Sequence, residues 1–182
     1  LESVIEELKF VVACKANVPV VTPIINKIGL LASKLPSGEI YALFKYVKGD
    51  SPLDMSASIV KEYAKVLDGL YIASFTHIAS NIHLEYDLVA RSINAAESYI
   101  SVTPDIDAIV NSLKKNLRAG KPLLSNLPKG IVHGDIKLSN TLFDNGRLVA
   151  LLDFDDYRYS YLIEDTTMAI MHNIHEPKQN IL

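Results

Sequence analysis

Residues 131–156, with the sequence IVHGDIKLSNTLFDNGRLVALLDFDD, limit the possible folds of this chain more than any other segment. Two apolar runs, 141–143 and 148–152, lie on either side of an Asp-Asn-Gly triplet at 144–146. Because Asn-Gly is a strong signal for a tight turn between antiparallel strands, this segment predicts a β-hairpin. A short strand at 131–133 is expected just before it. The chain must therefore fold so that polar loops leave the ends of short apolar strands.

The rest of the sequence predicts a mainly helical chain with two more strands. Apolar residues recur at helical spacing over 2–16, and Pro19 follows that helix. Thr103 and Pro104 are typical of a helix start, and Gly120 is expected just after the end of that helix. Further helices are predicted at 55–78, 84–100 and 162–174, and further strands at 28–33 and 40–47. This combination predicts the α+β fold class.

Composition excludes several other classes of protein. A chain of 182 residues fits one domain, and 49% apolar residues exclude intrinsic disorder. The net charge of −3, without a basic stripe, predicts no nucleic-acid partner. No apolar run approaches the roughly 20 residues that span a bilayer, so we expect no membrane partner. The single cysteine, Cys14, cannot form an internal disulfide, which fits a cytoplasmic location, and we expect it to be inert and buried.

Polar residues of the 131–156 segment have the chemistry that phosphoryl transfer requires. That reaction needs a carboxylate to receive the hydroxyl proton and a divalent cation to neutralise phosphate charge. Asp135 follows the first strand and can take the proton, whereas Asn140 and Asp153 can offer oxygen ligands to Mg²⁺. The predicted hairpin brings their two loops to the same edge. The sequence therefore predicts a phosphotransferase that uses Mg²⁺ as cofactor.

The pattern HGDIKLSN followed by LLDFD resembles the eukaryotic-like kinases, and most of all the aminoglycoside phosphotransferase and choline kinase superfamily. The motif of that superfamily is H-x-D, an Asn five positions later, and an apolar strand that ends in D-x-D or D-x-E. Residues 127–170 and 42–52 are most similar to the homoserine kinases of this fold. The resemblance implies a protein-kinase-like fold with a mostly helical C lobe and a remnant of the N-lobe sheet.

This resemblance divides the chain at residue 48. Residues 1–48 correspond to a partial N lobe with the hinge, and residues 49–182 to a C lobe with the catalytic and metal-binding loops. The glycine-rich phosphate loop and the lysine strand of the family have no counterpart here and are expected upstream of Leu1, which lies inside a predicted helix. We therefore expect a piece of a longer kinase that is incomplete at both ends.

Roles in catalysis follow from the resemblance residue by residue. Asp135 corresponds to the catalytic base, and Asn140 and Asp153 correspond to the metal ligands. Asp155 matches the second acid of the D-x-D pair and is expected to assist metal binding. Lys137 is either a contact of the nucleotide phosphates or a solvated lysine of the loop.

Other residues correspond to supporting positions of the family. His133 matches a structural histidine, and Asp165 matches an aspartate that braces the catalytic loop from the start of the last helix. Glu6 or Glu7 corresponds to the glutamate that pairs with the phosphate-binding lysine. The hinge that binds adenine through its backbone corresponds to Phe44, Lys45, Tyr46 and Val47.

The resemblance implies a kinase that uses ATP as cosubstrate and phosphorylates a hydroxyl of a small, amine-bearing molecule, with homoserine as the leading acceptor. Alternatives are a choline, ethanolamine or aminoglycoside kinase and, from another class, a nucleotide-binding pseudokinase without catalysis. A protein kinase fits less well, because Asp155 replaces the glycine expected after Asp153-Phe154 and the next predicted helix leaves no room for an activation loop. The acidic residues Asp153, Asp155, Asp156 and Glu164 would suit a cationic acceptor.

Two histidines near the end of the last predicted helix could also carry chemistry. His172 and His175 are three residues apart, which is the spacing of half a metal site. We interpret them instead as surface residues that are stabilised by the negative end of the helix dipole. The tyrosines Tyr157, Tyr159 and Tyr161 alternate along an extended segment and are expected to pack rather than to line the acceptor site.

Overall fold

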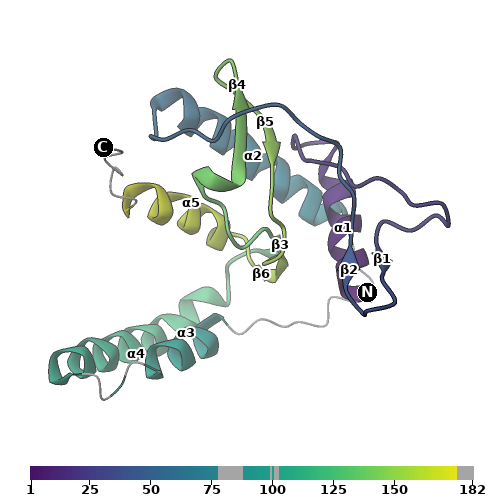
Figure 1. The fold of residues 1–182 in the computed structure, drawn as a ribbon. Coiled ribbons are helices and arrows are strands. Elements are labelled where there is room, and N and C mark those ends of the chain that lie inside the picture. The colour runs from purple at the N-terminus through teal and green to yellow at the C-terminus, as the bar shows by residue number, and fades with distance from the viewer. Residues whose placement is uncertain (78–87, 99, 101–102, 176–182) are drawn as a thin grey trace.

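The computed structural model describes residues 1–77, 88–98, 100 and 103–175 (Figure 1). The helices are α1 (Glu2–Cys14), α2 (Ala57–Thr76), α3 (Leu88–Glu97), α4 (Pro104–Leu124) and α5 (Ile163–His175), with a 3₁₀ turn at Leu138–Asn140. The strands are β1 (Ser33–Lys34), β2 (Ile40–Tyr41), β3 (Lys129–Val132), β4 (Thr141–Asp144), β5 (Arg147–Leu151) and β6 (Arg158–Tyr161). β1 pairs with β2, β3 with β6 and β4 with β5, all antiparallel. The predicted α+β fold class is confirmed.

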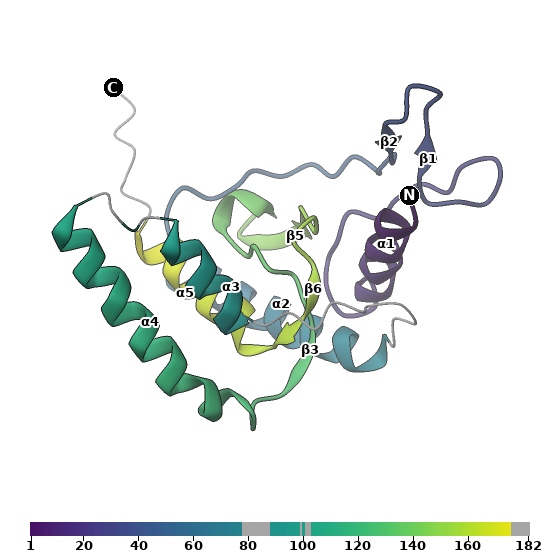
Figure 2. The ribbon, with the colours of Figure 1, turned by 90° about the horizontal axis from the view of Figure 1, so that it is seen from below.

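The hydrophobic core lies where α1 and α2 meet the strands that follow α4. Phe10 of α1, Leu70 of α2 and Leu151 of β5 are fully buried in it. A glycine at position 69 lets α2 approach the preceding loop, since a Cβ there would lie 2.5 Å from the carbonyl oxygen of Asn17. α3 and α4 pack against each other as a pair. Figures 1 and 2 both show β1 and β2 projecting on the α1 side of the molecule, away from that pair.

Local capping explains where two of the helices begin. Ser56 accepts a hydrogen bond from the Ile59 amide at the start of α2. Thr103 accepts one from the Ile106 amide at the start of α4, as the sequence predicted. The predicted end before Gly120 is wrong, because Gly120 does not adopt the left-handed backbone of a helix-ending glycine and α4 continues to Leu124. The predicted helix at 84–100 becomes α3, and its residues 84–87 lie outside the described residues.

The two strands predicted before residue 48 are much shorter than expected. The predicted strand at 28–33 is replaced by a turn, and β1 covers only Ser33–Lys34. The Asn26 side-chain oxygen accepts the amides of Ile28 and Leu30 at 3.0 and 2.8 Å, and Gly29 has a φ of +86°. A side chain that binds these amides competes with a strand ladder for them. Over residues 42–50, the backbone pairs with other segments only at isolated bridges, such as the one between Phe44 and Pro23.

The hairpin predicted at the centre of the sequence is present. β4 and β5 pair with Asp144 opposite Arg147, and both residues of the turn between them, Asn145 and Gly146, have positive φ. β3 begins at Lys129, two residues before the predicted strand, because it pairs with β6 along its whole length. The segment with alternating tyrosines forms this β6 partner. Within the described part of the chain, no helix is long and apolar enough to cross a membrane.

Candidate active site

The loop that follows β3 carries Asp135 and is shaped by a glycine before it. Gly134 has a φ of +87°, in the region that favours glycine. A Cβ at this position would lie 2.1 Å from Nη1 of Arg158 and 2.4 Å from the carbonyl oxygen of Asp156. The loop therefore turns tightly against the segment after β5, and no residue with a side chain fits there. This close approach brings the two polar loops together.

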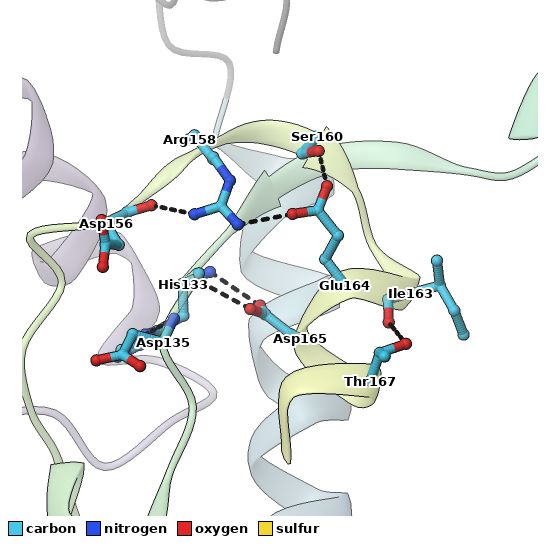
Figure 3. A network of polar contacts seen from close by, with 10 residues as sticks. His133, Asp135, Asp156, Arg158, Ser160, Ile163, Glu164, Asp165 and Thr167 are labelled. Atoms are coloured by element: carbon cyan, nitrogen blue, oxygen red, sulfur yellow. Dashed lines mark hydrogen bonds and ion pairs between the residues drawn. The ribbon is translucent and has the colours of Figure 1, made fainter. Parts of the chain in front are cut away.

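Asp165, the third residue of α5, holds the backbone of the Asp135 loop (Figure 3). Its Oδ2 accepts the His133 amide at 2.8 Å and its Oδ1 accepts the Gly134 amide at 2.9 Å. The Asp165 side chain is fully buried. Burial raises the pKa of Asp165, while the two backbone N–H groups act in the opposite direction. The structure thus contains the contact between the last helix and the catalytic loop that the sequence predicted.

His133 joins the two loops through both of its ring nitrogens. Nδ1 accepts the Asp135 amide at 3.2 Å, and Nε2 lies 2.9 Å from the carbonyl oxygen of Leu152, the residue before Asp153. A ring that accepts at Nδ1 and donates at Nε2 is neutral. Burial lowers the pKa of His133, which agrees with this neutral form. His133 therefore holds the two loops together from a buried position, in line with the structural role that the resemblance implies.

The two oxygens of Asp135 have different surroundings. Oδ2 accepts a hydrogen bond from Lys137 Nζ at 2.6 Å and another from Asn140 Nδ2 at 3.0 Å. Oδ1 lies 4.0 Å from Nε2 of His172 on α5. The bond to Asp135 raises the pKa of the Lys137 ammonium. Lys137 thus contacts the proposed base directly, a contact that neither of its two sequence-based interpretations included.

Asn140 and Asp153, the predicted metal ligands, are connected through the hairpin. The Leu152 amide donates to the Asn140 carbonyl at 2.9 Å, which ties the two loops just before Asp153. The Asn140 amide nitrogen donates to Asp135, so its side-chain oxygen, the atom that binds cations, points away from that carboxylate. Asp153 has a φ of +61°, a strained backbone for a residue with a side chain. Asp153 and Asp155 are both exposed.

The donor set fits Mg²⁺ bound together with a phosphate ligand. Among the described residues, no group of three or more His, Cys, Asp and Glu side chains could hold a metal ion. Mg²⁺ is usually bound by one or two carboxylates, with substrate phosphates and water completing the shell. Asn140 and Asp153 offer hard oxygen ligands of this kind, and Asp155 lies two residues further along the same loop.

A pocket of about 320 Å³ lies beside these acids. Its lining includes Glu7, Val21, Phe44, Leu151, Asp153 and Asp155. Burial, Asp155 and Asp153 together raise the pKa of Glu7 to about 7. Glu6 instead forms an ion pair with Lys9 at 2.6 Å on the helix surface. Of the two glutamates that the sequence left open, Glu7 is therefore the one that faces the acids of the site.

The predicted hinge residues lie at different distances from this pocket. Phe44 lines it and pairs with Pro23 on the neighbouring segment. The Lys45 amide donates to the Thr22 carbonyl at 3.3 Å, so it is already bound within the chain. Tyr46 is 90% exposed, and neither it nor Val47 is among the lining residues. The structure thus places Phe44, and not the whole 44–47 segment, at the pocket.

A second acid of α5 holds the other loop, a role that the sequence analysis did not assign to it. Glu164 Oε2 accepts from Arg158 Nη2 at 2.7 Å, and Arg158 Nη1 donates to the Asp156 carbonyl at 2.8 Å (Figure 3). Ser160 also donates to Glu164, which is buried. The interpretation of Glu164 as part of an acidic surface for a cationic acceptor is therefore wrong. An Arg six residues before an acidic pair at a helix start was the available signal.

His172 has a neighbour that its sequence-based interpretation did not include. Its side chain is 39% exposed, which fits the expected surface position near the helix end, but its Nε2 lies 4.0 Å from Asp135 Oδ1. The register of α5 decides this position, because Asp165 is anchored to the catalytic loop and residue 172 comes about two turns later on the same face. Sequence spacing alone could not find it, since the contact joins two distant segments.

The sequence matches a family of phosphotransferases, and the fold is that of protein-kinase-like enzymes. The model of the Phosphotransferase enzyme family matches residues 1–181, and this chain belongs to that family. A homoserine kinase from Gluconobacter oxydans (strain 621H) is 28% identical over 115 residues, which are 62% of this chain and 36% of that kinase.

Solved structures with the same fold are kinases as well. The amicoumacin kinase hAmiN, in complex with AMP-PNP, Ca²⁺ and Ami, has a TM-score of 0.73 at 13% identity, over 96% of this chain and 54% of that one. A thermostable mutant of the aminoglycoside phosphotransferase APH(4)-Ia, with ADP and hygromycin B, has a TM-score of 0.60 at 16% identity, over 89% and 59%. The chain therefore spans only a little over half the length of these structures.

Proposed function

We propose that this chain carries the catalytic loops of an ATP- and Mg²⁺-dependent kinase that phosphorylates a hydroxyl of a small, amine-bearing molecule. The observation that carries the proposal is the arrangement around Asp135. One of its oxygens is held by Lys137 and Asn140, the other stays open, and Asp165 fixes the loop beneath it. A general base needs this combination of a fixed backbone and an open oxygen.

In the proposed reaction, Asp135 receives the proton of the acceptor hydroxyl as that oxygen attacks the γ-phosphorus of ATP. A bond forms between the hydroxyl oxygen and phosphorus, the bond from phosphorus to the β–γ bridging oxygen breaks, and ADP leaves with the electron pair. Mg²⁺ bound at Asn140 and Asp153 would neutralise phosphate charge. Lys137 stabilises the carboxylate at Oδ2 and leaves Oδ1 for the proton.

Homoserine is the acceptor that we propose first. The support is the 28% identity with the homoserine kinase from Gluconobacter oxydans, together with the segments 127–170 and 42–52 that resemble such kinases. L-homoserine carries both a primary hydroxyl and an amine, so it fits the small, amine-bearing class. The experiment that tests this acceptor is a screen of ATP-dependent phosphorylation with L-homoserine, choline, ethanolamine and gentamicin. Transfer to another acceptor alone would overturn the homoserine assignment.

The role of Asp135 is tested by Asp135→Asn in the full-length protein. We expect kcat to fall by about 10²–10⁴-fold, the contribution of a general base, with Mg·ATP affinity unchanged. Asp153→Ala should instead weaken Mg·ATP binding as well as the rate, since a metal ligand acts in the ground state too. Asp144→Asn, an exposed Asp on the same hairpin, is the matched control. A wild-type protein that binds Mg·ATP but transfers no phosphoryl group to any acceptor would support the pseudokinase alternative.

A further inference from the structure

The open oxygen of Asp135 faces a side chain to which the proposed mechanism gives no task. His172 Nε2 lies 4.0 Å from Asp135 Oδ1, whereas Oδ2 is occupied by Lys137 and Asn140. Within the described residues, the His172 ring makes no hydrogen bond, and its side chain is 39% exposed. An imidazole at this position is thus partly open to solvent and does not have the bonds of a structural histidine such as His133.

The distance between His172 Nε2 and Asp135 Oδ1 leaves room for one hydroxyl oxygen between them. At 4.0 Å, the His172 nitrogen and the Asp135 oxygen are too far apart for a direct hydrogen bond, which is about 2.7–3.2 Å long. A single oxygen atom placed between them can lie at about 2.8 Å from both. A hydroxyl there would donate its proton to Asp135 Oδ1 and accept a hydrogen bond from the Nε2–H of His172.

The position of His172 is fixed by the same helix that fixes the catalytic loop. Asp165 binds the backbone of that loop at two amides, and residues seven positions apart lie on the same face of a helix. α5 therefore fixes the backbone on both sides of the 4.0 Å gap, because it carries His172 and holds the loop of Asp135 through Asp165.

We propose that His172 is a second binding residue for the acceptor hydroxyl, which it holds against Asp135 Oδ1. The inference rests on the proposed kinase function and adds a contact to it. As the hydroxyl loses its proton to Asp135, its oxygen keeps the hydrogen bond from His172 and turns its remaining lone pair to the γ-phosphorus. The imidazole exchanges no proton in this step, so the balance of the transfer is unchanged. The ligand class is an alcohol small enough to enter between a helix and a loop.

The test compares His172→Phe with His172→Gln in the full-length protein. Phe keeps the planar bulk and removes the N–H, whereas the Gln amide restores a donor at similar reach. With L-homoserine, choline, ethanolamine and gentamicin as probes, we expect His172→Phe to lower kcat/KM for the acceptor about tenfold, as the loss of one hydrogen bond predicts. The KM for ATP and the Tm should stay at wild-type values. His172→Gln should recover most of the lost kcat/KM.

Met171→Phe is the matched control, because it adds the same aromatic ring at the preceding, exposed position of α5. It should leave kcat/KM unchanged. An unchanged acceptor kcat/KM in His172→Phe overturns the inference, and so does an equal loss in ATP affinity or Tm, which would show a purely structural role. A failure of the proposed function is seen separately, because the wild-type protein would then phosphorylate none of the four probes.

Discussion

In each of two loops of this protein, one side chain accepts hydrogen bonds from two backbone amides, but the surroundings of the two side chains differ. In the catalytic loop, Asp165 accepts two backbone amides from another segment and is fully buried. In the 26–30 turn, Asn26 also accepts two amides, but those of Ile28 and Leu30 a few residues away, and both of these residues are exposed. The bonds of Asp165 join segments that are distant in the sequence, whereas the bonds of Asn26 only turn the backbone within one segment.

The difference explains why the catalytic region is dense in contacts and the 20–50 segment is not. Around Asp135, two adjacent acids of α5 hold one loop each, Asp165 directly and Glu164 through Arg158. Over 20–50, strands of two residues and isolated pairings leave apolar side chains such as Ile28 and Tyr46 exposed. Buried hydrogen bonds between distant segments, together with buried apolar side chains of the core, therefore distinguish the organised region.

Of the two side chains Asp165 and Asn26, the buried Asp165 is expected to give the largest loss of stability when it is removed. Asp165→Ala leaves two buried amides without an acceptor, and we expect the free energy of unfolding to fall by about 2–6 kcal/mol. It should also lower kcat, because the loop that carries Asp135 loses its anchor, while ATP affinity changes little. Asn26→Ala, the matched change in the exposed turn, should cost less than about 1 kcal/mol, since water can replace the lost bonds.

Urea unfolding and acceptor kinetics of both variants check this prediction. Asp165→Ser separates two roles, because Ser can still accept at the helix start but reaches less far. Equal losses of stability in the Asp165 and Asn26 variants would contradict the comparison. Full recovery of kcat by Ser would show that the two bonds from Asp165 to the loop are not needed to position Asp135.

An apolar pair sharpens the same comparison. Ile136 follows Asp135 and is fully buried, whereas Ile28 is 79% exposed. Ile136→Ala should lower the free energy of unfolding by about 2–5 kcal/mol through lost burial and a cavity. Ile28→Ala should change it by less than about 0.5 kcal/mol. Thermal or urea denaturation of the two variants measures both values, and a large loss for Ile28→Ala would show that this side chain is covered in solution.

The smallest effect on stability is expected at Glu7, which lies between the 20–50 segment and the loop of Asp153. Its pKa is raised from 4.5 to about 7, so the native state binds more protons than the unfolded state between these values, and stability falls as pH rises through that window. Without Mg²⁺, Glu7→Gln should be more stable than the wild type by about 1 kcal/mol at pH 8, a value reduced for the half-exposed position of the group. The difference should disappear below about pH 4.5.

Urea unfolding of the two proteins at several pH values in the presence of EDTA measures this difference. Adding Mg²⁺ should reduce it, because a cation at Asp153 and Asp155 cancels part of the repulsion that raises the Glu7 pKa. A difference that does not vary with pH would contradict the assignment of Glu7 to the site.

Short-range chemistry made the centre of the chain predictable from sequence. The Asn-Gly turn and the Thr103 cap depend on residues close along the chain, and both are found where they are expected. The contact of Asp165 with the loop of His133 was also predicted, because the resemblance to known kinases implies a tertiary contact that composition alone does not indicate. The division of the chain into lobes at residue 48 and the catalytic roles stay predictions.

Only the tertiary structure decided the contacts between distant segments. The choice of Glu7 over Glu6 depends on which face of α1 packs against the acids of the site. His172 reaches Asp135 because α5 is anchored two turns earlier. A local pattern predicts helix or strand, but the register of one element against another is determined by packing and by buried hydrogen bonds, which no single segment encodes.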